Sequence, residues 1–120
     1  MFREAKITPT KIGQFVTLWK RTNTNPIEPF NTYDDFDFVI IYTKTKTNFG
    51  LFLFSKNVLT QNTIISNDKK LGKLGFRVYP IWDKVENKQA IKTQKWQLNY
   101  FYDFSNEVTF DFDNFRKLLQ

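Results

Sequence analysis

The 120-residue chain contains no cysteine and no histidine. Without cysteine the protein has no disulfide and no thiol nucleophile. Without histidine it has no Ser–His–Asp triad, no zinc finger of the usual kind and no imidazole base or metal ligand. These two absences exclude most of the common catalytic and metal-binding arrangements.

Long hydrophobic runs are also missing. The longest strictly apolar stretches are residues 38–42 and 51–54, far short of the roughly 20 residues that a membrane-spanning helix needs. The first six residues, MFREAK, lack the apolar block of a signal peptide. The four glycines and four prolines form no linker that would divide the chain. We therefore expect a single domain over residues 1–120, located in the cytoplasm and not associated with a membrane.

Positive charge and aromatic side chains are abundant. The chain carries 18 Lys and Arg against 12 Asp and Glu, together with 14 Phe, 5 Tyr and 3 Trp. Residues 44–95 hold eleven cationic and three acidic side chains, whereas residues 28–37 and 103–120 are mainly acidic. This distribution favours nucleic acid, another polyanion or an acidic protein as partner. The alternative is an ordinary solvated surface.

Hydrophobic periodicity predicts the strands. Segments that alternate in polarity, or are apolar on both faces, are typical of β-structure. The connection at residues 43–48 has the length of a hairpin loop, and Ser55 is placed to cap one helical turn over residues 55–59. The expected strands cover residues 15–21, 37–43, 49–54, 64–65, 76–79 and 108–112.

Between residues 85 and 102 the hydrophobic period becomes helical. Trp96 lies away from the apolar stripe of this helix, so the main core does not explain it. It is either a binding residue or packs under a loop or against the last helix. A last helix is expected after Asp113 or Asn114. The stripe of the helix over residues 85–102 that is expected to face the core consists of Ala90, Ile91, Gln94, Leu98 and Phe101.

The fold class is mixed α/β, a single domain with a central mixed sheet of about five strands flanked by helices.

Three segments resemble the MepB family: AKITPTKIGQFVTLWKR at residues 5–21, FRVYPIWD at 76–83 and QAIKTQKWQ at 89–97. The stretch FGLFLFSK at residues 49–56 is similar to the family's middle strand, with Ser55 where a proline is usual. The resemblance implies a fold similar to the core of restriction-endonuclease-like nucleases, a mixed sheet with flanking helices. It implies no established activity.

A nuclease of that fold is the enzymatic alternative. Such a site needs an acidic residue at the start of one strand and a second carboxylate two residues before a lysine on the next. The carboxylates hold Mg²⁺ and the lysine orients water. Asp37 begins one expected strand and Lys56 ends the next, but residue 54 is Phe, which cannot bind a metal. Asp37 and Lys56 are therefore weak candidates for catalysis, Asp37 is a weak metal ligand, and no cofactor is expected unless this alternative holds.

Binding without catalysis suits the residues better. Lysine and arginine neutralise phosphates, tryptophan stacks on bases and glutamine reads base edges; burial in the core is the alternative for each tryptophan. We expect a non-catalytic domain that binds nucleic acid or another polyanion. A degenerate or displaced nuclease and an interaction module for an acidic protein are the alternatives, and the oligomeric state stays open. The candidate binding residues are Lys6, Thr8, Lys11, Gln14, Trp19, Arg21, Arg77, Trp82, Gln94 and Trp96.

Overall fold

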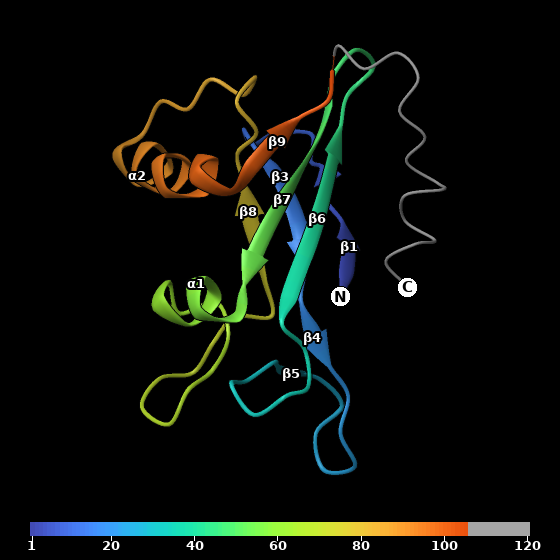
Figure 1. The fold of residues 1–120 in the computed structure, drawn as a ribbon, viewed down its shortest axis with the longest axis vertical. Helices are drawn as coiled ribbons and strands as arrows, with labels where there is room; N and C mark the ends of the chain where they lie inside the picture. Colours follow the sequence, from blue (N-terminus) through green and yellow to red (C-terminus); the bar gives the residue numbers. More distant parts are fainter. Residues whose placement is uncertain (106–120) are drawn as a thin grey trace.

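The computed structural model describes residues 1–105, shown in colour in Figure 1. Over these residues the chain forms nine short strands, two α-helices and one 3₁₀ turn, so the mixed α/β class predicted from the sequence is confirmed. The expected strand at 108–112 and the last helix lie outside the described residues. Within residues 1–105, no helix has the length and hydrophobicity needed to cross a bilayer.

A four-stranded mixed sheet contains the longest strands (Figure 1). Strand β1 (Phe2–Glu4) runs parallel to β6 (Phe38–Lys44). The pairs of β6 with β7 (Phe49–Ser55) and of β7 with β9 (Phe101–Asp103) are antiparallel. Strands β6 and β7 form a hairpin, closed where the Thr45 N–H donates to the Asn48 carbonyl at 2.7 Å. The sequence predicted this hairpin because a short polar connection joins two largely apolar strands. The order in the sheet is β1 (Phe2–Glu4), β6 (Phe38–Lys44), β7 (Phe49–Ser55) and β9 (Phe101–Asp103).

The remaining strands form two smaller antiparallel sheets, instead of joining one central sheet as expected. Strands β2 (Lys6–Ile7), β3 (Gln14–Thr17) and β8 (Gly75–Val78) form a three-stranded sheet, and β4 (Trp19–Lys20) pairs with β5 (Glu28–Pro29). The continuous strand expected at 15–21 is divided at Leu18. This residue is buried, and its N–H donates to the Leu74 carbonyl at 2.8 Å, so the chain changes partner there.

Both helices begin at side-chain caps. Helix α1 (Lys56–Gln61) follows Ser55, whose hydroxyl accepts from the Val58 N–H at 3.2 Å, as the sequence predicted. Helix α2 (Lys88–Gln97) follows Asn87, whose side-chain oxygen accepts from the Ala90 N–H at 2.8 Å. It continues into the 3₁₀ turn η1 (Leu98–Tyr100) and is therefore shorter than the expected 85–102.

The buried face of α2 differs from the predicted stripe. Ala90 is buried as expected, but Ile91 is 48% exposed. Gln97 is fully buried two turns after Ala90, and Trp96 is partly buried and packs against the core. The predicted stripe is wrong because it considered apolar residues alone. The buried face of α2 also carries Gln97, whose side chain forms hydrogen bonds with the backbone.

The core is an aromatic cluster around Phe54 of β7. The ring of Phe54 lies 5.4 Å from that of Phe52, 5.4 Å from that of Trp96 and 6.1 Å from that of Tyr100 between centroids. The expected strand at 64–65 is absent from the described structure. Ile64 and Ile65 are buried in an irregular segment, next to an isolated bridge between Asn31 and Ser66.

Candidate functional site

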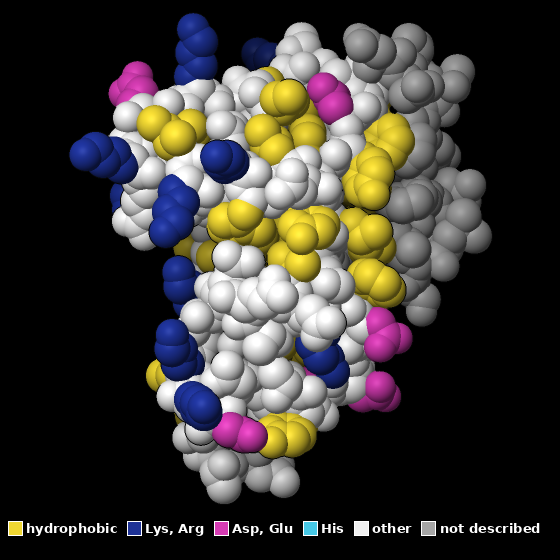
Figure 2. Space-filling model, turned by 60° about the vertical axis from the view of Figure 1, so that its left-hand side comes forward, with side chains coloured by type: hydrophobic (Ala, Val, Ile, Leu, Met, Phe, Trp, Pro, Cys, Tyr) yellow, Lys and Arg dark blue, Asp and Glu magenta, His cyan; other side chains and the backbone are white. Residues whose placement is uncertain are grey.

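A cleft with a volume of about 850 Å³ lies between α2 and β8. Figure 2 shows the side of the molecule where the helices lie. Hydrophobic side chains gather across the middle of this face, and Lys and Arg side chains lie mainly along its left border. We name this hollow the α2–β8 cleft. Its walls include Lys11, Asn62, Ile64, Lys73, Phe76, Arg77, Tyr79, Glu86, Gln89, Lys92, Thr93, Trp96 and Gln97.

The charges along the cleft are mostly positive. Lys11, Lys73, Arg77 and Lys92 line it, and the only carboxylate among the lining residues is that of Glu86. The three lysines are exposed. Ion pairs within residues 1–105 are confined to Lys20, which lies in another part of the fold. The cationic groups of the cleft are therefore not neutralised by carboxylates of the described chain.

The side chain of Arg77 is held in place by its neighbours. Its Nη2 donates to Oγ1 of Thr8 at 2.9 Å, and its Nη1 donates to the Gly13 carbonyl at 3.4 Å. The guanidinium carbon lies 5.8 Å from the centre of the Phe15 ring. Thr8, predicted as a ligand contact, thus orients Arg77, whose guanidinium is held in a fixed position by these contacts.

Trp96 packs against the core and also lines the cleft. Its ring packs against that of Phe54 at 5.4 Å with an interplanar angle of 49°, and the residue is also part of the cleft wall. The prediction that it lies off the core is therefore wrong, because the helix turns this face toward β7. The Trp96 ring therefore has a buried aromatic neighbour on its core side and lines the cleft as well.

Two glutamines of α2 connect the helix to β8 and the loop after it. Gln97 Nε2 donates to the Arg77 carbonyl at 2.9 Å, and its Oε1 accepts from the Tyr79 N–H at 2.8 Å. Gln94 Nε2 donates to the carbonyls of Tyr79, Pro80 and Asp83 at 3.3, 3.0 and 3.1 Å. The Nε2 group of Gln94 therefore binds the protein backbone, and its role in reading bases stays a prediction.

The burial of Gln14 does not suit its predicted role of reading base edges. Its side chain points inward from β3 and the residue is only 2% exposed, so it cannot reach a base edge. Nε2 donates to the Lys44 carbonyl at 3.4 Å, while Oε1 is buried without a hydrogen-bond partner. A carboxylate oxygen of Asp83 is likewise buried without a partner, and burial raises the pKa of this carboxyl.

The other predicted binding residues are spread over the surface and do not join the cleft. Lys6 is exposed on β2. Arg21 lies with its guanidinium 5.3 Å from the ring of Trp19, in the region of β4 at the far end of the molecule from α2 (Figure 1). Trp82 packs edge-on against Phe101 at 5.5 Å, with its Nε1 buried. Of the ten candidates, the cleft gathers Lys11, Arg77 and Trp96.

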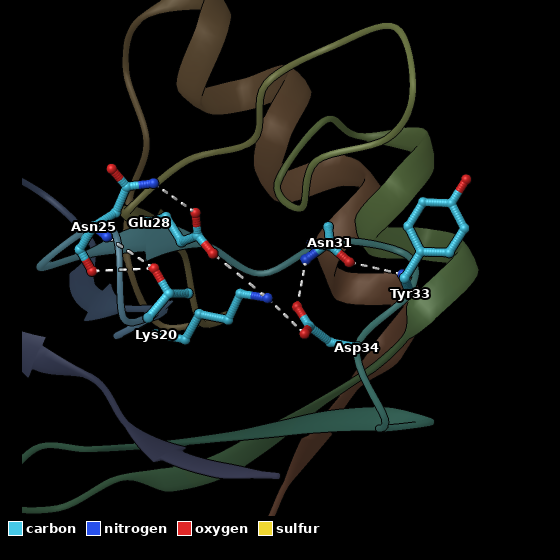
Figure 3. A network of polar contacts seen from close by, with 7 residues as sticks. Lys20, Asn25, Glu28, Asn31, Tyr33 and Asp34 are labelled. Carbon is cyan, nitrogen blue, oxygen red and sulfur yellow. Dashed lines mark hydrogen bonds and ion pairs between the residues drawn. The ribbon is translucent and has the colours of Figure 1, made fainter.

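A polar network occupies the acidic segment before β6 (Figure 3). Lys20 Nζ lies 2.6 Å from an Asp34 carboxylate oxygen and 3.7 Å from one of Glu28. The other Asp34 oxygen accepts from the Asn31 N–H at 2.8 Å. Burial acts to raise the pKa of Asp34, but the hydrogen bonds from Lys20 and Asn31 and the charges of Lys20 and Lys56 outweigh it, so the pKa is lowered.

Lys56 and Asp37 are not arranged as a metal-dependent centre. Lys56 Nζ donates to the carbonyls of Asp34 at 2.6 Å and Thr32 at 3.3 Å, and it lies 4.9 Å from the Phe36 ring centre. Asp37 is exposed, and its carbonyl accepts from the Lys56 N–H. Among residues 1–105 no group of three or more acidic side chains is placed to hold a metal ion. Lys56 thus fastens the turn before β6 to the start of α1.

Comparisons with known proteins agree with the motifs found in the sequence. A family model described as MepB-like matches residues 1–103. A solved structure described as "Crystal Structure of MepB" superposes with a TM-score of 0.83 at 36% sequence identity, over 92% of this chain and 71% of that chain. A search of the curated proteins finds no match. The similarity therefore includes both segments that form the cleft, β8 and α2.

Proposed function

This chain belongs to the MepB-like family, and we propose that it binds nucleic acid, or a closely related polyanion, in the α2–β8 cleft without catalysing a reaction. One observation carries the proposal: four cationic side chains, with one carboxylate among them, line the same cleft as the aromatic side chains of Trp96 and Tyr79. Lysines and arginines that contact phosphates release counterions, which favours binding. The net charge of +6 supports attraction of such a ligand from a distance.

Nuclease activity is a weaker proposal. In support of it, the four-stranded mixed sheet suits a core like that of restriction-endonuclease-like proteins, and we propose that relationship for the fold. Against it, Phe54 stands where the second carboxylate would be needed, and it is buried in the core. The ammonium of Lys56 is also committed to two backbone carbonyls. A cytoplasmic location suits either proposal.

A matched pair of lysines on α2 tests the proposal. Lys92 and Lys95 are both exposed and both carry one charge, but only Lys92 lines the cleft. Short labelled DNA and RNA strands are titrated with wild type, Lys92→Ala and Lys95→Ala at several salt concentrations, with fluorescence anisotropy as readout. We expect the logarithm of the wild-type affinity to fall linearly with that of the salt concentration.

The two variants separate a cleft from a diffuse charge effect. Loss of one phosphate contact in Lys92→Ala flattens the salt slope by about 0.7–0.9 and weakens binding, while Lys95→Ala stays close to wild type. Equal effects of the two substitutions would contradict binding in the cleft. Cleavage that requires Mg²⁺ and is abolished by Asp37→Ala would establish the nuclease instead. Binding to acidic proteins but to no nucleic acid would establish an interaction module.

A further inference from the structure

We propose that the α2–β8 cleft accepts one unpaired nucleotide, with its base against Trp96 and its flanking phosphates on the cationic rim. The inference rests on the proposed function and specifies the form of nucleic acid that is bound. It makes the protein selective for single strands, or for duplexes with an unpaired base, over fully paired duplexes.

The floor of the cleft suits the flat face of a base. Trp96 is a partly exposed aromatic side chain there, the buried side chains of Phe76 and Ile64 lie behind it in the lining, and Phe54 supports Trp96 from the core side. Because Phe54 is fully buried, the Trp96 ring cannot withdraw without disturbing the core. A fixed aromatic surface stacks with any base, since every base has a π-face.

The concave shape of the site favours an unpaired base over paired bases. A volume of about 850 Å³ lies within the roughly 300–1,000 Å³ that is usual for sites that enclose a small molecule. Bases inside a duplex are stacked and cannot enter a concave site unless they are flipped out, whereas bases of a single strand are free to enter. A flat or convex basic surface would instead contact the backbone of either form.

The walls offer groups for the edges of a base and for phosphates. The side chains of Gln89 and Thr93 line the cleft, and within residues 1–105 they form no side-chain hydrogen bond with the protein. Lys11 and Arg77 come from the side of the three-stranded sheet, while Lys92 comes from α2. Cationic groups on both sides of the floor match the alternation of base and phosphate along a strand.

Trp96 can report its own contact if the other two tryptophans are replaced. The protein contains three tryptophans, so a Trp19→Phe, Trp82→Phe background leaves Trp96 as the only indole fluorophore. Four probes are titrated: a short single strand, its fully paired duplex, the same duplex with one bulged nucleotide, and inorganic polyphosphate. We expect strong quenching by the single strand and the bulged duplex, and little by the paired duplex or polyphosphate.

Two substitutions then test the ring itself. Trp96→Phe retains an aromatic face and should keep the preference for single strands, whereas Trp96→Leu should lower single-strand affinity about tenfold toward that of the duplex. Circular dichroism and thermal melting identify the variants that are folded. The ratio of single-strand to duplex affinity in wild type needs no variant, so it tests the inference even if Trp96→Leu fails to fold.

The failures of the two proposals are distinguishable. Equal wild-type affinity for single strand and paired duplex, or quenching of Trp96 by polyphosphate as strong as by the single strand, overturns the unpaired-base inference and leaves polyanion binding intact. Absence of binding to all four probes at low salt overturns the proposed function itself.

Discussion

The side-chain amide of Gln97 forms two hydrogen bonds with the backbone of Arg77 and Tyr79, as the backbone of a neighbouring strand would. Its Oε1 accepts from the Tyr79 N–H at 2.8 Å, and its Nε2 donates to the Arg77 carbonyl at 2.9 Å. One amide thus satisfies a donor and an acceptor two residues apart on the outer edge of the three-stranded sheet. The contact positions α2 against β8, and both elements contribute residues to the lining of the cleft.

Replacing Gln97 should cost stability. Gln97→Leu keeps the apolar stem but leaves the Tyr79 N–H and the Arg77 carbonyl without partners. Each buried polar group left unpaired costs about 1–3 kcal/mol, so we expect the free energy of unfolding to fall by about 2–4 kcal/mol in urea titrations. Gln89→Leu, an exposed position on the same helix, is the control and should change the value by about 0.5 kcal/mol or less. Similar values for both variants would contradict the assigned role.

Asp34 should stabilise the protein at neutral pH and lose this effect in acid. Its pKa is lowered in the folded state, so its stabilising contribution is present above the ordinary aspartate pKa of about 3.9 and disappears as pH falls through the lower, folded value. We expect Asp34→Asn to be less stable than wild type at pH 7. Urea titrations at a series of pH values should show the difference shrinking below pH 4, and a difference independent of pH would refute the assignment.

The ionised carboxylate of Asp83 should destabilise the protein, the opposite of the effect of Asp34. Burial raises its pKa, so between the ordinary value of about 3.9 and the folded value the native state binds more protons than the unfolded state. Stability therefore falls as pH rises through this interval, and the penalty is complete above the folded pKa. We expect Asp83→Asn to raise the melting temperature at neutral pH, with a smaller gain in acid. A loss of stability at neutral pH would show that the carboxylate has a favourable partner.

Substitutions of Lys56 and Asp37 should show whether these two residues have a structural or a catalytic role. Lys56→Met retains the stem over the Phe36 ring but removes the bonds to the Thr32 and Asp34 carbonyls. We expect a loss of about 1–3 kcal/mol in the free energy of unfolding, because bonds to a charged donor are strong. Asp37→Ala, at an exposed position, should leave both stability and nucleic-acid affinity unchanged. A large loss of affinity in Asp37→Ala would place the ligand at this segment and not in the cleft.

Features set by neighbouring residues were predictable from the sequence. The β6–β7 hairpin follows from two apolar runs joined by a short polar connection, and the start of α1 follows from the cap at Ser55. Pairings between distant segments were not predictable. Strand β1 has only three residues and lies beside β6, and Leu18 turns toward Leu74 instead of continuing the strand. Nothing in the local pattern specifies such partners.

The same limit applies to the cleft. Lys11, Arg77 and Trp96 were identified from residue type, since cations and an indole suit a polyanion wherever the fold brings them together. The backbone contacts of Gln94 could not be predicted, because an amide that reads a base and an amide that binds the backbone look alike in a sequence. Gln97 carried a usable signal: it follows Ala90 by two helical turns and therefore lies on the buried face. A polar residue on such a face predicts a bond to backbone.

The glutamine contacts of α2 also affect how the protein behaves at high concentration. Strand β8 is the outermost strand of its sheet, and an open edge offers N–H and C=O groups to strands of other molecules, which leads to aggregation. Gln97 and Gln94 occupy the backbone groups of Arg77 and Tyr79 on that edge. While α2 is packed against β8, it shields the edge of β8 from pairing with strands of other molecules. If α2 detaches and β8 stays folded, we expect this edge to become a template for self-association.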